Sequence, residues 1–298
     1  MSNLASSYHR LRSSQSAMNK VSLVAKLIVA VCLVIFAVFP VLWIFSAALD
    51  PTSQLGSQNL IPPQAGFQNF EKLFNNPLLP FWNWVWNSIK VAGITTVLSL
   101  SITTMAAYAF SRLRFAGRMT MLKAILLVQV FPNLLALVAI YLMIEQTGHI
   151  IPGLGLESHA GLILVYLGGS MGINIWLMKG FLDTIPRAID EAAMIDGATN
   201  WQIFTQLLLP LLRPILIVVG ILAFIGTYGD FVLARILLSK AENYTLMVGL
   251  TLFTNNQFAQ NWGPFSAGAL IGALPVMAIY LALQDQIAGG LTVGAVKE

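Results

Sequence analysis

The chain has 298 residues, of which 57% are hydrophobic and only 9% are charged. Soluble domains usually carry about 25% charged residues, so the composition excludes an ordinary soluble domain and indicates an integral membrane protein. The net charge of +4 does not indicate a nucleic-acid partner, because the basic residues gather in the segments between apolar runs. A single cysteine, Cys32, excludes an internal disulfide.

Six apolar runs predict an all-α membrane protein. A spanning helix needs about 20 mostly apolar residues, and the runs lie at 27–49, 91–111, 124–144, 158–178, 214–234 and 265–283. Pro132 should kink the third span, where the amides of Gln129 and Asn133 need partners or water. The expected organisation is an N-terminal segment (1–21), a first span (22–49), a loop (50–85), a core with the other five spans (86–287) and a tail (288–298).

The basic residues predict the orientation. With the N-terminus and alternate loops assigned to the cytoplasm, twelve of the sixteen basic residues fall on that side, and the other side keeps Lys72, Lys90, Arg235 and Lys240. This bias follows the positive-inside rule. We therefore expect both termini to be cytoplasmic and the loop 50–85 to be extracytoplasmic.

The common catalytic motifs give little support for an enzyme. The GGSMG stretch around Ser170 fits a G-x-S-x-G pattern, but all three histidines (His9, His149 and His159) precede it. A membrane serine protease with its base on a later helix is therefore a weak hypothesis. No HExxH motif or other metal-ligand spacing occurs, and the absence of any Gly-Lys dipeptide excludes a Walker A loop. If the protein uses ATP, another chain must bind it.

One segment, 183–212, concentrates acidic residues: Asp183, Asp190, Glu191 and Asp196. Each would cost about 2.5–3.5 kcal/mol at the centre of a spanning helix, so the segment must lie outside the hydrocarbon, on the cytoplasmic side. Gly197 predicts a hinge between two short helices, and Thr199 with Gln202 forms a capping-box pattern. Ile203, Leu207 and Pro210 recur at helical spacing. Interfacial helices on lipid favour Lys and Arg, so an acidic face favours a basic protein partner.

This segment resembles a known family. Glu191-Ala-Ala-x-x-x-Gly197, followed by Leu207-x-Leu209-Pro210, resembles the EAA loop of binding-protein-dependent ABC importer permeases, and EAAMIDGATNWQIF is similar to the maltose/maltodextrin-type members of the carbohydrate branch. The resemblance implies a MetI-like permease fold in a bacterial inner membrane. It assigns ATPase coupling to Glu191, Ala192, Ala193, Asp196, Gly197, Ala198, Leu209 and Pro210.

The same resemblance implies the partners. They are a second, homologous permease, an ATPase homodimer that uses ATP and Mg, and an extracytoplasmic sugar-binding protein; no cofactor or metal is expected on this chain. Contacts with the ATPase are implied for the tail residues Gly290, Leu291, Thr292 and Gly294. Contacts with the binding protein are implied for a loop that contains Asn255, Asn256, Gln257, Gln260 and Asn261.

Asp230 is an acid within an expected span, and such residues are functional hypotheses by default. With Gln129 and Asn133 it is a candidate for lining the transport pathway. It could instead contact Arg235 or a neighbouring helix. An ion-coupled secondary transporter with Asp230 as its coupling site is the alternative function.

Overall fold

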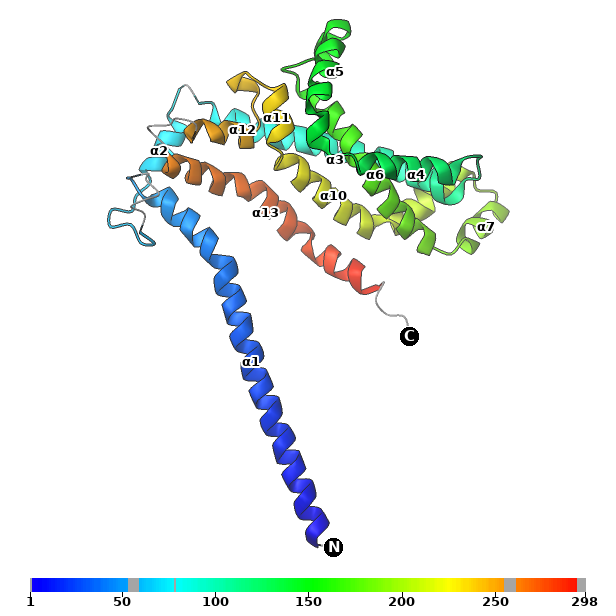
Figure 1. Cartoon of the computed structure of the whole chain (residues 1–298). Helices are drawn as coiled ribbons and strands as arrows, with labels where there is room; N and C mark the ends of the chain where they lie inside the picture. Colours follow the sequence, from blue (N-terminus) through cyan, green and yellow to red (C-terminus); the bar gives the residue numbers. More distant parts are fainter. Residues whose placement is uncertain (1, 53–58, 78, 255–260, 294–298) are drawn as a thin grey trace.

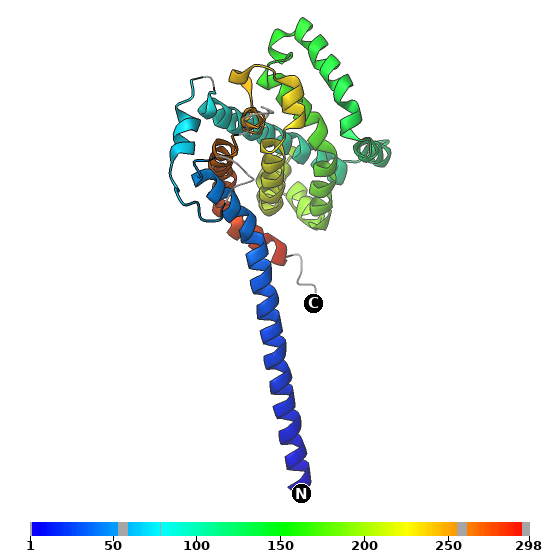
Figure 2. The same ribbon diagram turned by 60° about the vertical axis from the view of Figure 1, so that its left-hand side comes forward.

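The structure, a computed structural model, describes residues 2–52, 59–77, 79–254 and 261–293. Within these ranges the chain is helical and forms no strand, so the prediction of an all-α protein is confirmed. Figure 1 shows one long helix, α1, that extends away from a bundle formed by the rest of the chain. The outer end of α1 and the end of α13 point to the same side of this bundle in Figures 1 and 2.

Helix α1 covers Ser2–Leu49 without interruption, so the expected N-terminal segment and the first span form one helix. The most apolar window of its Ser22–Leu49 portion has no side chain buried within the chain. Among the side chains of α1 that the structure describes, the buried ones are Ser46, Ala47 and Ala48 in the last turn. There α1 meets α13 (Trp262–Val293) and α2 (Gln68–Phe74). The apolar surface of α1 therefore needs a cover from outside this chain.

The bundle is built on α3 (Phe81–Arg112), which packs against α6 (His159–Thr184) and α10 (Arg213–Tyr228), and α10 in turn packs against α13. Trp84 of α3 is fully buried, and its Nε1 donates to the carbonyl of Ala241 over 2.7 Å. Gly249 lies against the Trp84 ring, so close that a Cβ there would be 2.2 Å from it. The short elements around this core are η3 (Pro152–Leu154), α11 (Val232–Leu237), η5 (Ala241–Asn243), α12 (Leu246–Leu250) and η6 (Thr251–Phe253).

The third expected span is broken rather than kinked. Helix α4 covers Arg118–Gln129, and after Pro132 come η2 (Asn133–Ala136) and α5 (Leu137–Ile150), which leaves in a different direction (Figure 1). Proline cannot donate a backbone hydrogen bond and disfavours helical geometry in the residue before it. The single kinked helix expected over 124–144 is therefore wrong, and two separate helices take its place.

Within the described residues, three helices are long and apolar enough to cross a membrane: Ser22–Leu49, Phe81–Arg112 and Trp262–Gln286. The number rises to five if each of two bent helix pairs counts as one span. One of these pairs joins Asn200–Leu211 to Arg213–Tyr228 with a bend of 75°. The total of six spans stays a prediction.

The loop before α6 is hydrogen-bonded to the loop after α11 through Glu157, and we call this contact the Glu157 clamp. Glu157, between η3 and α6, has a φ of 63° and accepts hydrogen bonds from the backbone N–H groups of Ser239 (2.6 Å) and Lys240 (3.1 Å). Burial raises the pKa of Glu157, but the donors of Lys240 and Ser239 outweigh it and hold that pKa below its ordinary value. The ionised carboxylate thus fixes the loop after α11.

Candidate functional site

The acidic segment forms two short helical pieces joined at a glycine. The first is α7 (Ala188–Ile195), and the second runs through α8 (Asn200–Gln202), the π-helix η4 (Ile203–Leu208) and α9 (Leu209–Leu211). Gly197 lies between them with a φ of 84°, in the left-handed region that favours glycine. The predicted glycine hinge is confirmed.

The capping box is also confirmed. The Gln202 N–H donates to Thr199 Oγ1 over 3.3 Å, and the Thr199 N–H donates to Gln202 Oε1 over 2.8 Å. The backbone N–H groups of Thr199 and Gln202 therefore both find acceptors in local side chains. This explains why the second helical piece begins where the sequence predicts.

The predicted apolar stripe of this second piece is partly wrong. Ile203 is buried as expected, but the other buried side chains are Phe204 and Leu208, while 37% of Leu207 is exposed. The reason is the π-helix η4, whose i→i+5 hydrogen bonds shift the inward positions away from the α-helical spacing. Ile203 and Leu208 belong to one buried cluster with Met178 and Leu182 of α6.

Two of the four acids bind within the chain. Asp190 is buried, and its Oδ2 lies 2.6 Å from Arg112 Nε at the end of α3. Asp183 accepts a hydrogen bond of 2.6 Å from Ser111 Oγ and pairs with Lys179. Burial raises the pKa of Asp183, but the hydrogen bonds from Lys179 and Ser111 outweigh it and lower the pKa overall. The interpretation of all four acids as one face for a partner is therefore corrected.

The other two acids are exposed. Glu191 and Asp196 lie among large apolar side chains that are also exposed: Met194 (53%), Ile195 (87%) and Trp201 (63%). We call these five residues the EAA face. Apolar groups of this size, uncovered on a structured surface, are typical of an interaction site. Of the other coupling candidates, Ala192 and Pro210 are exposed, and Ala193, Ala198 and Leu209 are partly buried.

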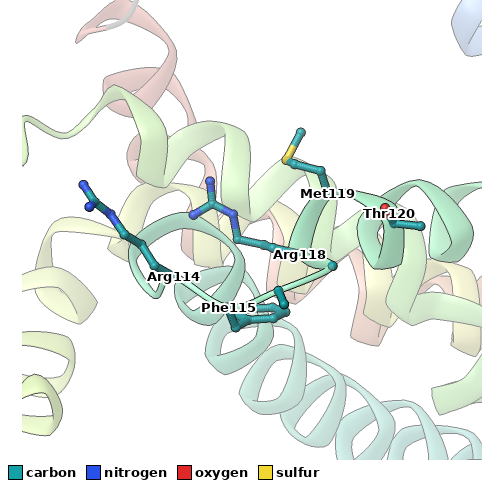
Figure 3. A pocket seen from close by; sticks show the side chains of 7 residues that line it. Arg114, Phe115, Arg118, Met119 and Thr120 are labelled. Atoms are coloured by element: carbon teal, nitrogen blue, oxygen red, sulfur yellow. The ribbon is translucent and has the colours of Figure 1, made fainter.

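A basic turn adjoins this segment. Residues 113–117 connect α3 to α4, and an open cavity of about 630 Å³ is lined by Arg114, Phe115, Ala116, Gly117, Arg118, Met119 and Thr120. Figure 3 shows the side chains of Arg114 and Arg118 extending from the turn, with their guanidinium groups apart. Arg118 donates to the Leu113 carbonyl over 3.1 Å. In the sequence, these arginines indicate only the orientation of the chain in the membrane.

Two of the three polar candidates within the expected spans, Gln129 and Asp230, are hydrogen-bonded within the chain. Gln129 Nε2 donates to the Gly169 carbonyl of α6 over 3.2 Å. Asp230 Oδ1 accepts from Tyr166 Oη of α6 (2.8 Å) and from the N–H groups of Leu233 and Ala234. Arg235 instead donates to Tyr244 Oη over 2.7 Å, and no ion pair joins it to Asp230 among the described residues.

Several predicted residues fall outside what the structure describes. Asn255, Asn256, Gln257, Gln260 and Gly294 lie in undescribed segments, and the side chains of Asn133 and Ser170 are not described. Asn261 is exposed, and its N–H donates to the Phe253 carbonyl over 2.9 Å. The backbone of Gly290, Leu291 and Thr292 belongs to α13, so helix continues past the expected start of the tail at 288.

Residues 99–292 match the model of a family described as binding-protein-dependent transport system inner membrane component. The chain is 48% identical over 223 residues to the maltose/maltodextrin transport system permease protein MalG of Vibrio vulnificus (strain YJ016). The aligned residues are 74% of this chain and 74% of that relative. It is 39% identical over 270 residues to the protein of the same name from Escherichia coli (strain K12), covering 87% of this chain and 90% of that relative.

Two solved structures share the fold. One is a bacterial ABC transporter involved in the import of the acidic polysaccharide alginate, with a TM-score of 0.75 and 22% identity over 89% of this chain and 96% of that chain. The other is a bacterial alginate ABC transporter in complex with an alginate pentasaccharide-bound periplasmic protein. Its TM-score is 0.60 and its identity 17%, over 72% of this chain and 80% of that chain. At these identities the likeness concerns the fold alone.

Proposed function

Because the chain belongs to the family of binding-protein-dependent transport system inner membrane components and is a permease subunit of a sugar ABC importer, we propose that its cargo is an oligosaccharide of the maltose/maltodextrin type. The identity of 48% to a maltose/maltodextrin permease supports this cargo. The family model covers α6, α7, α10 and most of α13, so the relationship includes the EAA face.

The EAA face is the proposed contact with a partner ATPase. The observation that carries this proposal is the exposure of Glu191 and Asp196 beside Ile195, which is 87% exposed. A cleft with basic and apolar side chains would complement both features. The small side chains of Ala192 and Ala193 allow close approach of a partner, and Gly197 sets the angle between the two helical pieces.

The proposed cycle uses the ATPase for the chemistry and this chain for the movement. ATP binding and closure of an ATPase homodimer would draw the two EAA segments of a permease pair together and turn the helix bundles from inward-open to outward-open. Sugar then passes from the binding protein into the cavity, and hydrolysis of ATP with Mg in the partner resets the complex. This chain contributes no catalytic group.

A second, homologous permease is the proposed cover for α1. The apolar part of that helix has no side chain buried within the chain, and its exposed side chains include Phe36 at 79%. Lipid covers part of such a surface, and a partner subunit covers the rest. We place the complex in a bacterial inner membrane with cytoplasmic termini, which follows the charge bias of the sequence.

Two further contacts belong to the same proposal. The loop that ends at Asn261 would face the extracytoplasmic binding protein, because its amide side chains suit polar recognition. The end of α13 with Gly290, Leu291 and Thr292, together with Gly294, would contact the ATPase dimer on the cytoplasmic side.

The test is the ATPase activity of the complete transporter in proteoliposomes, with its binding protein and a panel of sugars. Stimulation by maltose and maltotriose is the expected result. If only another sugar stimulates hydrolysis, the proposed maltose/maltodextrin cargo is wrong, but the chain is still a subunit of an ABC importer. If no ATPase copurifies and no sugar stimulates hydrolysis, the coupling role of the EAA face is wrong.

A further inference from the structure

The C-terminal end of α3 is joined to both pieces of the acidic segment. Arg112 contacts Asp190 of α7, and its Nη2 donates to the Ile185 carbonyl over 2.9 Å. Arg187 Nη2 returns a hydrogen bond of 3.0 Å to the Ser111 carbonyl of α3. These contacts fix the entrance to α7 from two directions.

The second helical piece is held by the preceding turn of α3. Tyr108 Oη donates to the Asn200 carbonyl over 3.1 Å, and the rings of Tyr108 and Phe204 have their centroids 5.0 Å apart. Ala107 is fully buried and packs in the cluster that contains Ile203 and Leu208. Thus α3 contacts the segment on both sides of the Gly197 hinge.

The charged pair within this junction is well shielded. The side chains of Arg112 and Asp190 are only 7% and 8% exposed. A buried charge is costly unless its partner is in place. Among the described residues, neither Asp190 Oδ1 nor Arg112 Nε has a hydrogen-bond partner, and the contact between the two side chains is the ion pair in which Nε and Oδ2 lie 2.6 Å apart.

By contrast, the covalent continuation of the segment is bent. The helix over Asn200–Leu211 meets Arg213–Tyr228 at 75°, so a push along the first is not transmitted straight along α10. Helix α3 is a continuous α-helix over Phe81–Arg112, and it packs on both α6 and α10. It is the stiffer route from the EAA face into the bundle.

We propose that Arg112 and Asp190 form a positioning pair that joins the two EAA helical pieces to α3 as one rigid body. Movement of a partner at the EAA face is then delivered to α3 and, through it, to α6 and α10. Without the pair, the segment rotates relative to α3, and its movement is no longer transmitted to the helix bundle. This inference rests on the proposed coupling function and assigns the residues that transmit it.

The first experiment measures sugar taken up per ATP hydrolysed by the complete transporter in proteoliposomes. We expect Arg112→Gln and Asp190→Asn to copurify with the ATPase in wild-type amounts but to lower this ratio about tenfold. The charge-reversed double variant Arg112→Asp/Asp190→Arg should recover a large part of the ratio. Arg114→Gln, two residues away in the exposed turn, is the matched control and should keep the wild-type ratio. Assembled single variants with a wild-type ratio would overturn the proposal.

A second experiment does not depend on removing the pair. In a Cys32→Ser background, Tyr108→Cys and Phe204→Cys are joined by a short, reducible thiol cross-linker, which locks α3 to η4. If these elements move as one body, the cross-linked and reduced forms of this variant transport equally well. Loss of transport on cross-linking, with recovery on reduction, would show relative movement and overturn the proposal even if the single variants fail to assemble.

The two proposals fail in different ways. If Gly197→Asp also leaves sugar uptake per ATP unchanged, the coupling function of the EAA face itself is wrong. If Gly197→Asp uncouples the transporter and Arg112→Gln does not, coupling stands and only the positioning pair is wrong.

Discussion

Tyr166 Oη lies 2.8 Å from Asp230 Oδ1, so the carboxylate in the fifth expected span is bound by the neighbouring helix α6. The same oxygen accepts from the Leu233 and Ala234 N–H groups at the start of α11. Asp230 precedes the N-cap residue Phe231, and its carboxylate satisfies two first-turn N–H groups of α11 as a capping side chain does. It favours the structural hypothesis for Asp230 over ion coupling.

The cap leads to the first prediction. Asp230→Asn preserves an acceptor at a position where asparagine caps well, so sugar uptake should stay within about twofold of wild type. Asp230→Ala removes the cap and should lower the free energy of unfolding by about 1 kcal/mol. Uptake by proteoliposomes, with and without a proton ionophore, checks both variants. An Asp230→Asn protein that binds ATPase normally but has lost uptake would restore the ion-coupled alternative.

The second prediction concerns Gly197, whose φ is 84°. Gly197→Asp should leave membrane insertion intact but uncouple ATP hydrolysis from sugar uptake, because the side chain strains the hinge and adds charge beside the EAA face. Gly117→Asp is a matched control, since Gly117 also has a left-handed φ of 79° and open space around it. Its coupling should equal that of wild type. Equal coupling in both variants would contradict the docking role of the hinge.

The third prediction uses the Glu157 clamp. Its pKa in the folded protein lies below the ordinary value of 4.5, so its stabilising contribution is complete above that pH and is lost as pH falls through the folded value. Glu157→Gln should lower the thermal unfolding midpoint by a few degrees at pH 7. The difference from wild type should shrink as the pH is lowered below 4.5. The thermal unfolding midpoints of both proteins, measured in detergent across this pH range, test this prediction. A difference in midpoint that stays constant with pH would contradict the role of the Glu157 carboxylate.

The fourth prediction tests the core around Trp84. Gly249→Ala places a Cβ 2.2 Å from the buried indole ring, and such overpacking should cost roughly 1–3 kcal/mol of unfolding free energy. Gly93→Ala is the control, because a Cβ on α3 there meets nothing within 4 Å. It should be neutral or slightly stabilising, since alanine favours helix. Thermal unfolding of the two purified variants provides the comparison.

The sequence by itself determined the features that depend on neighbouring residues. The glycine hinge and the Thr199–Gln202 cap are local, since a left-handed turn and a capping box are specified within a few positions. The prediction that the acidic segment lies outside the hydrocarbon rests on the cost of its charges alone. The family resemblance rests on this same segment.

Only the tertiary structure decided what the side chains of that segment bind. Nothing local distinguishes Asp190 from Glu191, but α3 brings Arg112 to Asp190 and leaves Glu191 exposed. The π-helix η4 moves Leu208 inward in place of Leu207, because packing on α6 outweighs the ideal helical period. Burial and ion pairing depend on residues far apart in the chain. Spacing along the sequence therefore predicts the hinge at Gly197 but not the ion pair between Arg112 and Asp190.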